Sequence, residues 1–470
     1  MASAALKADN RIQSTARTDW ALVSIVATLL ILGSVMVFSA SFSWSMAGAD
    51  HPFYFLSRQL IWVIVGATIA TILARIPYQW WDRVSIPMMG AGLLAMLAVI
   101  TFGAEKYGAT RTFFDGSVQP SEPVKIIIVI YISAWLASKG EQIRDVRVGL
   151  LPFGILLGVL TLLIMLQPSI STAILVVATS SIMFFIAGAD MRQLGLIALA
   201  AAVTFWLIVQ YSSYASDRMD KYLASIWEPQ SSQEYQVKQG IEALIRGGFL
   251  GKGIGQGEAQ HGALPLSWTD NIFAVIGEET GLIGALVITL LFALLAHRGL
   301  RTALRAPDNF GMLLATGLTS LLVLQAILHA AVLVAAVPPT GVTLPFISYG
   351  GSSIVTTLSA VGILLSVSRA GIDKRSAKVV ARDKEMPVRE ALKQVDEVRQ
   401  SALARLFAYA RFDFGGRNGR SRLPSTRRTT TTSSSTARTK SSTSRSSASK
   451  VSGTGSSKAG TSRSSTRSHS

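Results

Sequence analysis

Apolar blocks, each of roughly 20 residues, recur along most of this 470-residue chain. Soluble domains scatter their apolar residues, whereas blocks of this length match the thickness of a bilayer when they are helical. The sequence therefore predicts an all-α integral membrane protein with ten transmembrane helices. The blocks run over 20–42, 59–74, 85–102, 121–137, 149–166, 172–187, 194–211, 271–296, 311–336 and 347–367.

The cations between the blocks predict the orientation, because cytoplasmic loops are enriched in Lys and Arg. If the N-terminus is inside, every short inner loop is basic. We therefore expect both termini in the cytoplasm and a large extracellular loop, residues 212–269, between helices 7 and 8. The first block is too long for a signal-peptide core, so we expect it to remain as a helix. The inner-loop cations are Arg75, Arg83, Lys139, Arg144, Arg147, Arg192, Arg298, Arg301 and Arg305.

The charge of the chain gathers at its C-terminal end. The net charge is +17, and residues 414–470 hold twelve Lys and Arg and no acid. We expect a cytoplasmic N-terminus over 1–19, a membrane domain over 20–370, an amphipathic helical segment over 371–411 and a disordered tail over 412–470. The basic tail favours anionic lipid as its partner, and its lack of aromatic residues after Phe414 argues against nucleic acid. The absence of cysteine excludes disulfides and thiol chemistry.

A lone carboxylate, Asp270, stands where a polar approach meets an apolar block. At the mouth of a membrane helix it can ionise and contact a head group, or it can simply complement the helix dipole. Glu278 and Glu279 lie about 12–14 Å further along the same helix. We interpret these two acids as structural, with Lys125 or the backbone of residues 338–353 as their expected partners.

Three more polar clusters fall at the outer ends of blocks. The first is residues 108–125, where Pro120 opens a helix that carries Glu122 and Lys125 on one face. The second is a Pro-marked break at Pro168. The third, residues 338–353, contains Gly350 and Gly351 and is predicted to be a re-entrant segment that lines a cavity. The outer side also carries cations that suggest an anionic ligand, although ordinary surface solvation and local ion pairs are the better explanation for any single one of them. A glycine run at 251–257 is able to cradle phosphate but is also typical of turns.

These motifs together resemble the SEDS family (shape, elongation, division and sporulation), which includes FtsW, RodA and SpoVE. The resemblance covers roughly residues 20–370. It rests on FLSRQLIWVIVG at 55–66, QPSExxK at 119–125, LQP at 166–168, TDxIFAVIGEExG at 269–281 and LPFISYGGSS at 344–353. The GEE cluster, the TLPFISYGG motif and the long tail are more similar to FtsW than to RodA. The chain departs from the family pattern at Ser169, Ser171, Thr112, Asn271 and His329.

The resemblance implies a peptidoglycan glycosyltransferase of the bacterial cytoplasmic membrane, with its active site outside. The implied donor is lipid II, an undecaprenyl-pyrophosphate-linked disaccharide-pentapeptide. The implied partners are a class B penicillin-binding protein and other divisome or elongasome membrane proteins. The resemblance also makes Asp270 the catalytic residue. The predicted substrate-binding residues are Arg111, Glu122, Lys125, Lys238, Gln239, Arg246, Lys252, Thr269, Ser348, Tyr349 and Ser352, and the predicted structural residues are Glu278, Glu279, Pro120, Pro168, Gly350 and Gly351.

The chemistry is consistent with one carboxylate. A pyrophosphate leaving group needs cations or a metal ion but no general acid, whereas the acceptor hydroxyl needs a base. We hypothesise that Asp270 deprotonates the acceptor 4-hydroxyl and that the anomeric carbon inverts. We expect no metal site built by the protein alone, and a divalent cation, magnesium or manganese, is compatible with the reaction. Three other hypotheses stay open: a RodA-like elongation polymerase, a lipid II flippase and a divisome scaffold.

Overall fold

The computed structural model describes most of the predicted membrane domain. The described residues are 18–48, 51–102, 104–106, 109–112, 119–167, 169–211, 235–259, 267–338 and 341–384, with a few residues of 216–224 and residues 264, 387 and 390. Pro168, the N-terminal residues 1–17 and the tail over 412–470 lie outside this set. Only the backbone of Arg111 is described. The predictions made for those parts of the chain remain predictions.

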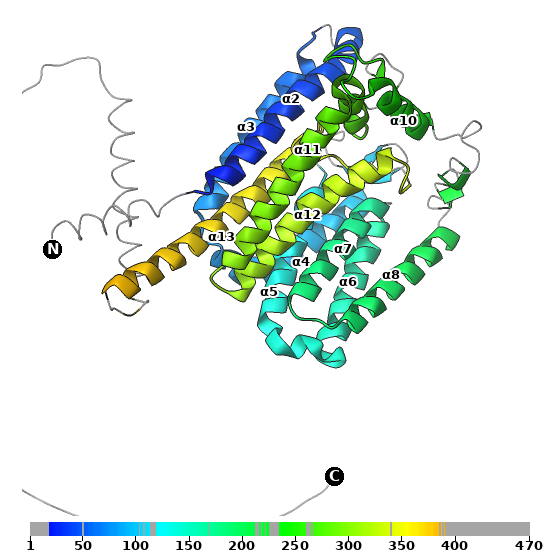
Figure 1. Ribbon diagram of the computed structural model, residues 1–470. Helices are drawn as coiled ribbons and strands as arrows, with labels where there is room; N and C mark the ends of the chain where they lie inside the picture. The colour runs from blue at the N-terminus through cyan, green and yellow to red at the C-terminus, as the bar shows by residue number, and fades with distance from the viewer. Residues whose placement is uncertain are drawn as a thin grey trace, which may run out of the picture. The chain divides into compact units, whose positions relative to one another are not determined.

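Helices account for nearly all of the described structure, as predicted (Figure 1). Nine of them, within the described residues, are long and apolar enough to cross a membrane. The predicted sixth span is an apolar helix of only 17 residues, so the count of ten spans rests on this shorter member. The helices are α2 (Trp20–Gly48), α3 (Tyr54–Arg75), α4 (Gln79–Phe102), α5 (Ser121–Lys139), α6 (Leu151–Met165), α7 (Ile170–Ile186), α8 (Met191–Tyr211), α10 (Tyr235–Gly247), α11 (Ile272–Arg305), α12 (Asn309–Leu333) and α13 (Gly351–Lys384).

The predicted all-α class needs a small correction. Two strands, β1 (Ala104–Lys106) and β2 (Ala109–Thr112), pair antiparallel in the connection after α4. A 3-10 helix (Gly140–Arg144) and a π-helix (Val146–Leu150) join α5 to α6. The sequence pattern missed the hairpin because it is too short to show alternating hydrophobicity.

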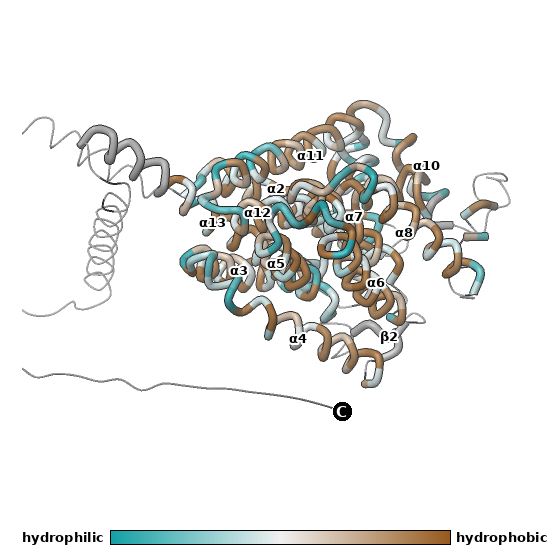
Figure 2. The backbone as a smooth tube through the Cα atoms, turned by 90° about the horizontal axis from the view of Figure 1, so that it is seen from below, coloured by the Kyte–Doolittle hydropathy of each residue, from teal (hydrophilic) through white to brown (hydrophobic). Residues whose placement is uncertain are grey.

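The core of the helical unit is built by α5, α12 and α13. Their spanning windows are 61%, 67% and 72% buried, compared with 6% for α8. Helix α13 packs along α3, and α11 packs against α12 and α2 (Figure 1). Figure 2 shows apolar residues along most of the length of the helices. Many large apolar side chains of the peripheral helices are exposed, as expected in a bilayer.

Helix α11 is kinked where the segment after α10 joins it. Gly281 has φ 68° and ψ −166°, which interrupts the helical hydrogen bonds. The freed amides of Leu282 and Ile283 donate to the carbonyls of Gly248 and Phe249 at 2.9 and 3.4 Å. In return, Lys252 N and Gly253 N donate to the carbonyls of Glu278 and Glu279, both at 3.0 Å. We call these four bonds the backbone splice.

The splice attaches part of the predicted large loop, residues 212–269, to the membrane domain. The contacts of residues 248–253 begin at Glu278, six residues after the start of α11, which is about 9 Å along its axis. Gly247 and Gly277 lie so close that a Cβ on Gly247 would overlap the Gly277 carbonyl. The described part of this loop is therefore attached along α11.

Candidate functional site

Asp270 lies in a turn immediately before α11. Asn271 is the N-cap of the helix, and Asp270 precedes it with an intermediate exposure. This position is consistent with both interpretations of Asp270. Its carboxylate is close to the positive end of the helix dipole, and it is exposed enough to contact a head group.

The turn that carries Asp270 is bonded to the segment between α12 and α13. The Ser348 hydroxyl donates to the Thr269 carbonyl at 2.8 Å, and Tyr349 N donates to the Trp268 carbonyl at 2.9 Å. Gly341 lies beside Asp270, since a Cβ built on it would be 3.4 Å from Asp270 Oδ2. The structure thus brings together two motifs that are about 70 residues apart in the sequence.

Helix α12 also bonds the segment that connects it to α13. His329 Nδ1 bonds the Val342 carbonyl at 2.7 Å, and Gln325 Nε2 donates to the Thr343 carbonyl at 2.9 Å. These two side chains are four residues apart and therefore lie on one helix face. His329 is 3% exposed, so it is a packed polar residue.

Glu122 and Lys125 extend this network. Lys125 Nζ lies 2.8 Å from Glu122 Oε1 and donates to Gln325 Oε1 at 3.1 Å, which confirms that the pair shares a helix face. Both residues are buried, and Glu122 Oε2 has no hydrogen-bond partner among the described residues. The pair therefore supports Gln325 and still offers one acceptor oxygen to a ligand.

The two acids of α11 have partners other than those predicted. Glu278 is fully buried and lies 2.9 Å from Arg246 Nε, while its second oxygen accepts from Ala259 N at 2.9 Å. Glu279 accepts from the Ser39 hydroxyl of α2 at 2.7 Å. The expected pairing with Lys125 or with residues 338–353 is wrong, because Lys125 is already held by Glu122 and Gln325 on α5 and α12.

The glycine run lies against these acids and is not an open phosphate cradle. Gly251, Gly253 and Gly255 all have positive φ. A Cβ on Gly257 would be 3.1 Å from Glu278 Oε2, so a side chain here would require the glutamates to shift. The run wraps carboxylates of the protein itself.

Several predicted ligands lie at some distance from this network. Lys252 bonds Glu258 at 2.6 Å, Lys238 is exposed on α10, and Gln239 is half-buried. Ser352 begins α13 with partial exposure, beside Gly351, which packs on the Trp62 ring. Arg246 keeps one donor, Nη2, buried and without a partner among the described residues.

The sequence reasoning left Arg58 out of the predicted ligands. Its guanidinium lies 5.0 Å from the Tyr54 ring centroid and hydrogen-bonds Tyr349. Phe55 on the same helix packs against Trp268 and Tyr349, with ring centroids 4.9 and 5.2 Å away. Burial raises the pKa of Tyr349, whereas Arg58 lowers it, and the net shift is upward, so the phenol is protonated at neutral pH. The FLSRQ motif was the available signal, since Arg58 stands at the start of an apolar block.

No group of three or more His, Asp and Glu side chains suited to a metal ion occurs among the described residues. Asp270 could supply a single carboxylate ligand. Magnesium is commonly bound by one or two carboxylates together with substrate phosphates. The residues present thus fit a cation that arrives with a pyrophosphate.

We expect Glu258 to make the stability of the segment between α10 and α11 depend on pH. Lys252 holds the pKa of this exposed carboxyl below its usual value, mainly through their hydrogen bond. Because the pKa of Glu258 is lower in the folded state than its unfolded value of 4.5, the ionised carboxylate stabilises the fold above pH 4.5. This stabilisation is lost as the pH falls through the pKa of the folded state. We expect the thermal midpoints of wild type and Glu258→Gln to differ at pH 7 and to converge below pH 4.5. A difference that persists in acid would contradict this assignment.

Comparisons with known proteins agree with this geometry. The family described as "Cell cycle protein", which comprises FtsW, RodA and SpoVE, matches residues 20–371. The chain belongs to this family. The match covers all the helices that contribute to the site, so the family resemblance predicted from the motifs is confirmed.

Individual relatives extend the family assignment. The chain is 37% identical over 357 residues to the "Probable peptidoglycan glycosyltransferase FtsW" of Geobacter metallireducens, covering 75% of this chain and 95% of that protein. It is similar to the solved RodA of Thermus thermophilus, with 26% identity, a TM-score of 0.56 and coverage of 75% and 97%. It also resembles a chain from "Structural coordination of polymerization and crosslinking by a peptidoglycan synthase complex", with 26% identity, a TM-score of 0.62 and coverage of 76% and 98%. The chain is thus a multi-pass membrane protein of the FtsW, RodA and SpoVE family.

Proposed function

We propose that this protein is a peptidoglycan glycosyltransferase that polymerises lipid II at the outer face of the cytoplasmic membrane. The observation that carries the proposal is the position of Asp270 at the start of α11, bonded through its turn to residues 341–349. A base at this place meets a sugar hydroxyl near the membrane surface, where the head group of a lipid-linked donor lies.

Asp270 acts in this proposal as the base that takes the proton from the acceptor 4-hydroxyl. The oxygen then attacks the anomeric carbon, the bond to the pyrophosphate breaks, and the configuration inverts. The leaving group departs as a stable anion, so no second carboxylate is needed, in contrast to glycosidases. A divalent cation, magnesium or manganese, would be held by Asp270 and would add charge stabilisation to the leaving pyrophosphate.

Cations of the chain support the leaving group. Arg58 is exposed next to Tyr349 and is therefore the candidate to contact the pyrophosphate. Charge-assisted contacts to phosphate oxygens are among the strongest hydrogen bonds that a protein makes. Lys252 is a weaker candidate, because Glu258 occupies its ammonium at 2.6 Å.

We infer a role in cell division with a cross-linking partner. Relatives carry the name FtsW, and the GEE cluster and long tail resemble FtsW. A similar chain belongs to a complex that couples polymerization with crosslinking, which supports a class B penicillin-binding protein as the partner here. Elongation remains the second candidate, because the solved RodA is similar over 75% of this chain.

The deciding experiment compares wild type with Asp270→Asn. Each protein is purified with its cognate penicillin-binding partner, whose own chemistry is blocked, and is given lipid II. We expect glycan chains from the wild type and a loss of at least about 100-fold in the variant, since asparagine keeps the size and removes the base. Circular dichroism and the thermal midpoint serve as the folding control.

The other outcomes discriminate between the alternatives. Equal polymer from both proteins would rule out Asp270 as the base. No polymer from either, in an assay where a known polymerase is active, would favour the flippase or scaffold hypotheses.

A further inference from the structure

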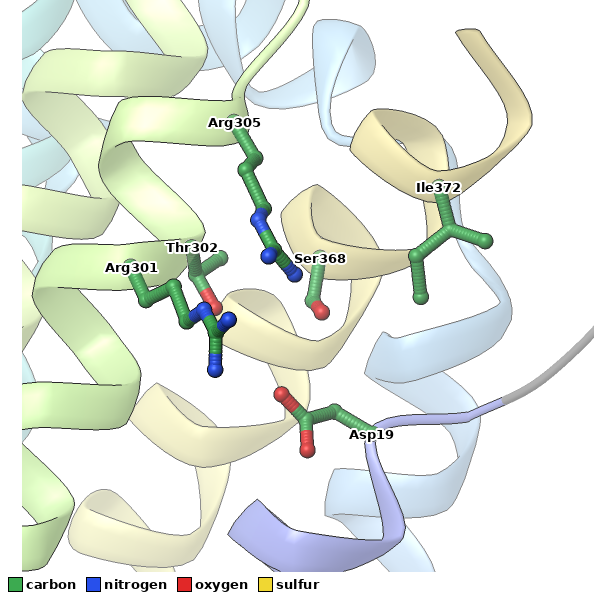
Figure 3. Close-up of a pocket in the computed structure, with 6 residues that line it drawn as sticks. All are labelled: Asp19, Arg301, Thr302, Arg305, Ser368 and Ile372. Atoms are coloured by element: carbon green, nitrogen blue, oxygen red, sulfur yellow. The ribbon is translucent and has the colours of Figure 1, made fainter. Parts of the chain in front are cut away.

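A pocket lies between the start of α2, the end of α11 and the last spanning turn of α13 (Figure 3). Its cavity volume is about 30 Å³, enough for one small polar group. The distribution of arginines places this end of the bundle in the cytoplasm, opposite the proposed active site. The lining residues are Asp19, Arg301, Thr302, Arg305, Ser368 and Ile372.

The charge of the pocket is positive. Arg301 and Arg305, one helical turn apart on α11, both extend into it (Figure 3). The single acid, Asp19, is already engaged, because it accepts from Leu22 N at 3.2 Å and lies 3.8 Å from Arg298. Arg301 makes no hydrogen bond or ion pair within the part of the chain that the structure describes. The pocket therefore contains one arginine, Arg301, whose charge is not paired by any described acid.

Ser368 is the second observation that points to a ligand. This side chain is 8% exposed and lines the pocket, with its hydroxyl directed into the open space (Figure 3). No described residue bonds this hydroxyl. A hydroxyl that faces an open pocket is free to bond a ligand or water that enters it. An oxygen placed between Ser368 and Arg301 would satisfy both groups.

The pocket lies at the level of the lipid head groups. Trp20 begins α2 next to Asp19 and is 70% exposed, and Trp80 near the start of α4 is 46% exposed. Exposed tryptophans mark the membrane interface. On α11, Leu300 and Leu304 are 46% and 83% exposed beside the two arginines. Acyl chains could therefore follow the helix while the phosphate enters the pocket.

We propose that this pocket binds the phosphate of an anionic phospholipid, such as phosphatidylglycerol, from the inner leaflet. Basic pockets between transmembrane helices on the cytoplasmic side are suited to such head groups. A bound phosphate would join α2, α11 and α13 at their cytoplasmic ends. The site is separate from the basic tail and is formed entirely by described residues.

The test uses the full-length protein in nanodiscs of phosphatidylcholine with a small fraction of phosphatidylglycerol, and native mass spectrometry counts the retained lipid. We expect one phosphatidylglycerol to be retained by wild type. The double variant Arg301→Gln, Arg305→Gln should bind it about 30-fold more weakly, because each arginine near the surface contributes about fivefold. Ser368→Ala should weaken retention by a smaller factor.

The matched control is Arg192→Gln, which removes an exposed arginine at the start of α8, on the same side but outside the pocket. It should retain the lipid as wild type does, and it also keeps the tail, so any binding by the tail cancels in the comparison. Equal losses in the control and the double variant would overturn the proposal. Thermal stabilisation by inorganic phosphate alone in pure phosphatidylcholine would identify a free-anion site and overturn the assignment to lipid.

Discussion

Gly251→Ala is expected to detach residues 248–253 from α11. Gly251 has φ +79°, and a Cβ there would overlap the Glu279 carbonyl. Alanine therefore meets two costs, about 1–2 kcal/mol for the left-handed backbone and about 1–3 kcal/mol for overpacking against a backbone that cannot move aside. We expect a loss of about 2–5 kcal/mol, visible as a lower thermal midpoint in detergent and as loss of polymerisation.

Two other glycines of the same segment separate these costs. Gly255 has φ +80°, and no atom lies within 4 Å of a Cβ built on it. Gly255→Ala should therefore lose only the stability that the left-handed backbone costs an alanine. Gly247 lies outside the positive-φ group, but its Cβ would overlap the Gly277 carbonyl, so Gly247→Ala should carry only the steric cost. If Gly251→Ala were no worse than Gly255→Ala, the close approach at the splice would be refuted.

Arg246→Ala is expected to leave a carboxylate uncompensated inside the protein. Glu278 is fully buried, and Arg246 at 2.9 Å is its nearest cation, with Lys252 at 3.7 Å. Removal of one partner from a buried ion pair costs about 3–5 kcal/mol. Because Lys252 remains, we expect a value toward the lower end, measured as a fall in the thermal midpoint.

Two further variants test that reason. Lys238→Ala removes an exposed cation from the same helix and should change stability by less than about 0.5 kcal/mol. Adding Glu278→Gln to Arg246→Ala removes the buried charge, so the double variant should be more stable than Arg246→Ala alone. If it were less stable, the loss would come from packing by the arginine stem and not from the stranded charge.

The sequence predicted those parts of the site that depend on local spacing. Glu122 and Lys125 are three residues apart, so helical geometry alone placed them together, and the structure confirms their contact. Pro120 directly precedes α5, as its fixed φ favours. Asp270 stands at the predicted mouth of its helix because a polar segment gives way abruptly to an apolar one.

Contacts across the chain could not be predicted in this way. Ser39 is one of several serines in an apolar block, and nothing in its spacing marks it as the partner of Glu279. Arg246 and the glycine run looked like ligands for phosphate, because cations and glycines are chemically suited to any anion. In the structure, Arg246 and the glycine run contact Glu278 and Glu279. The sequence could not show whether their anionic partner is a phosphate or a carboxylate of the protein itself.

The order of synthesis gives the two buried acids of α11 a protected entry into the membrane. Their partners all precede them in the chain: Ser39 by 240 residues, Arg246 by 32 residues before Glu278, and Ala259 by 19. At 5–20 residues per second, Ser39 leaves the ribosome about 10–50 s before Glu279. The transfer of an unpaired carboxylate into the bilayer costs about 3 kcal/mol of free energy. Ser39, Arg246 and Ala259, which donate to these acids, are all synthesised before them. Each glutamate therefore enters the membrane when its hydrogen-bond donor is already present in the chain.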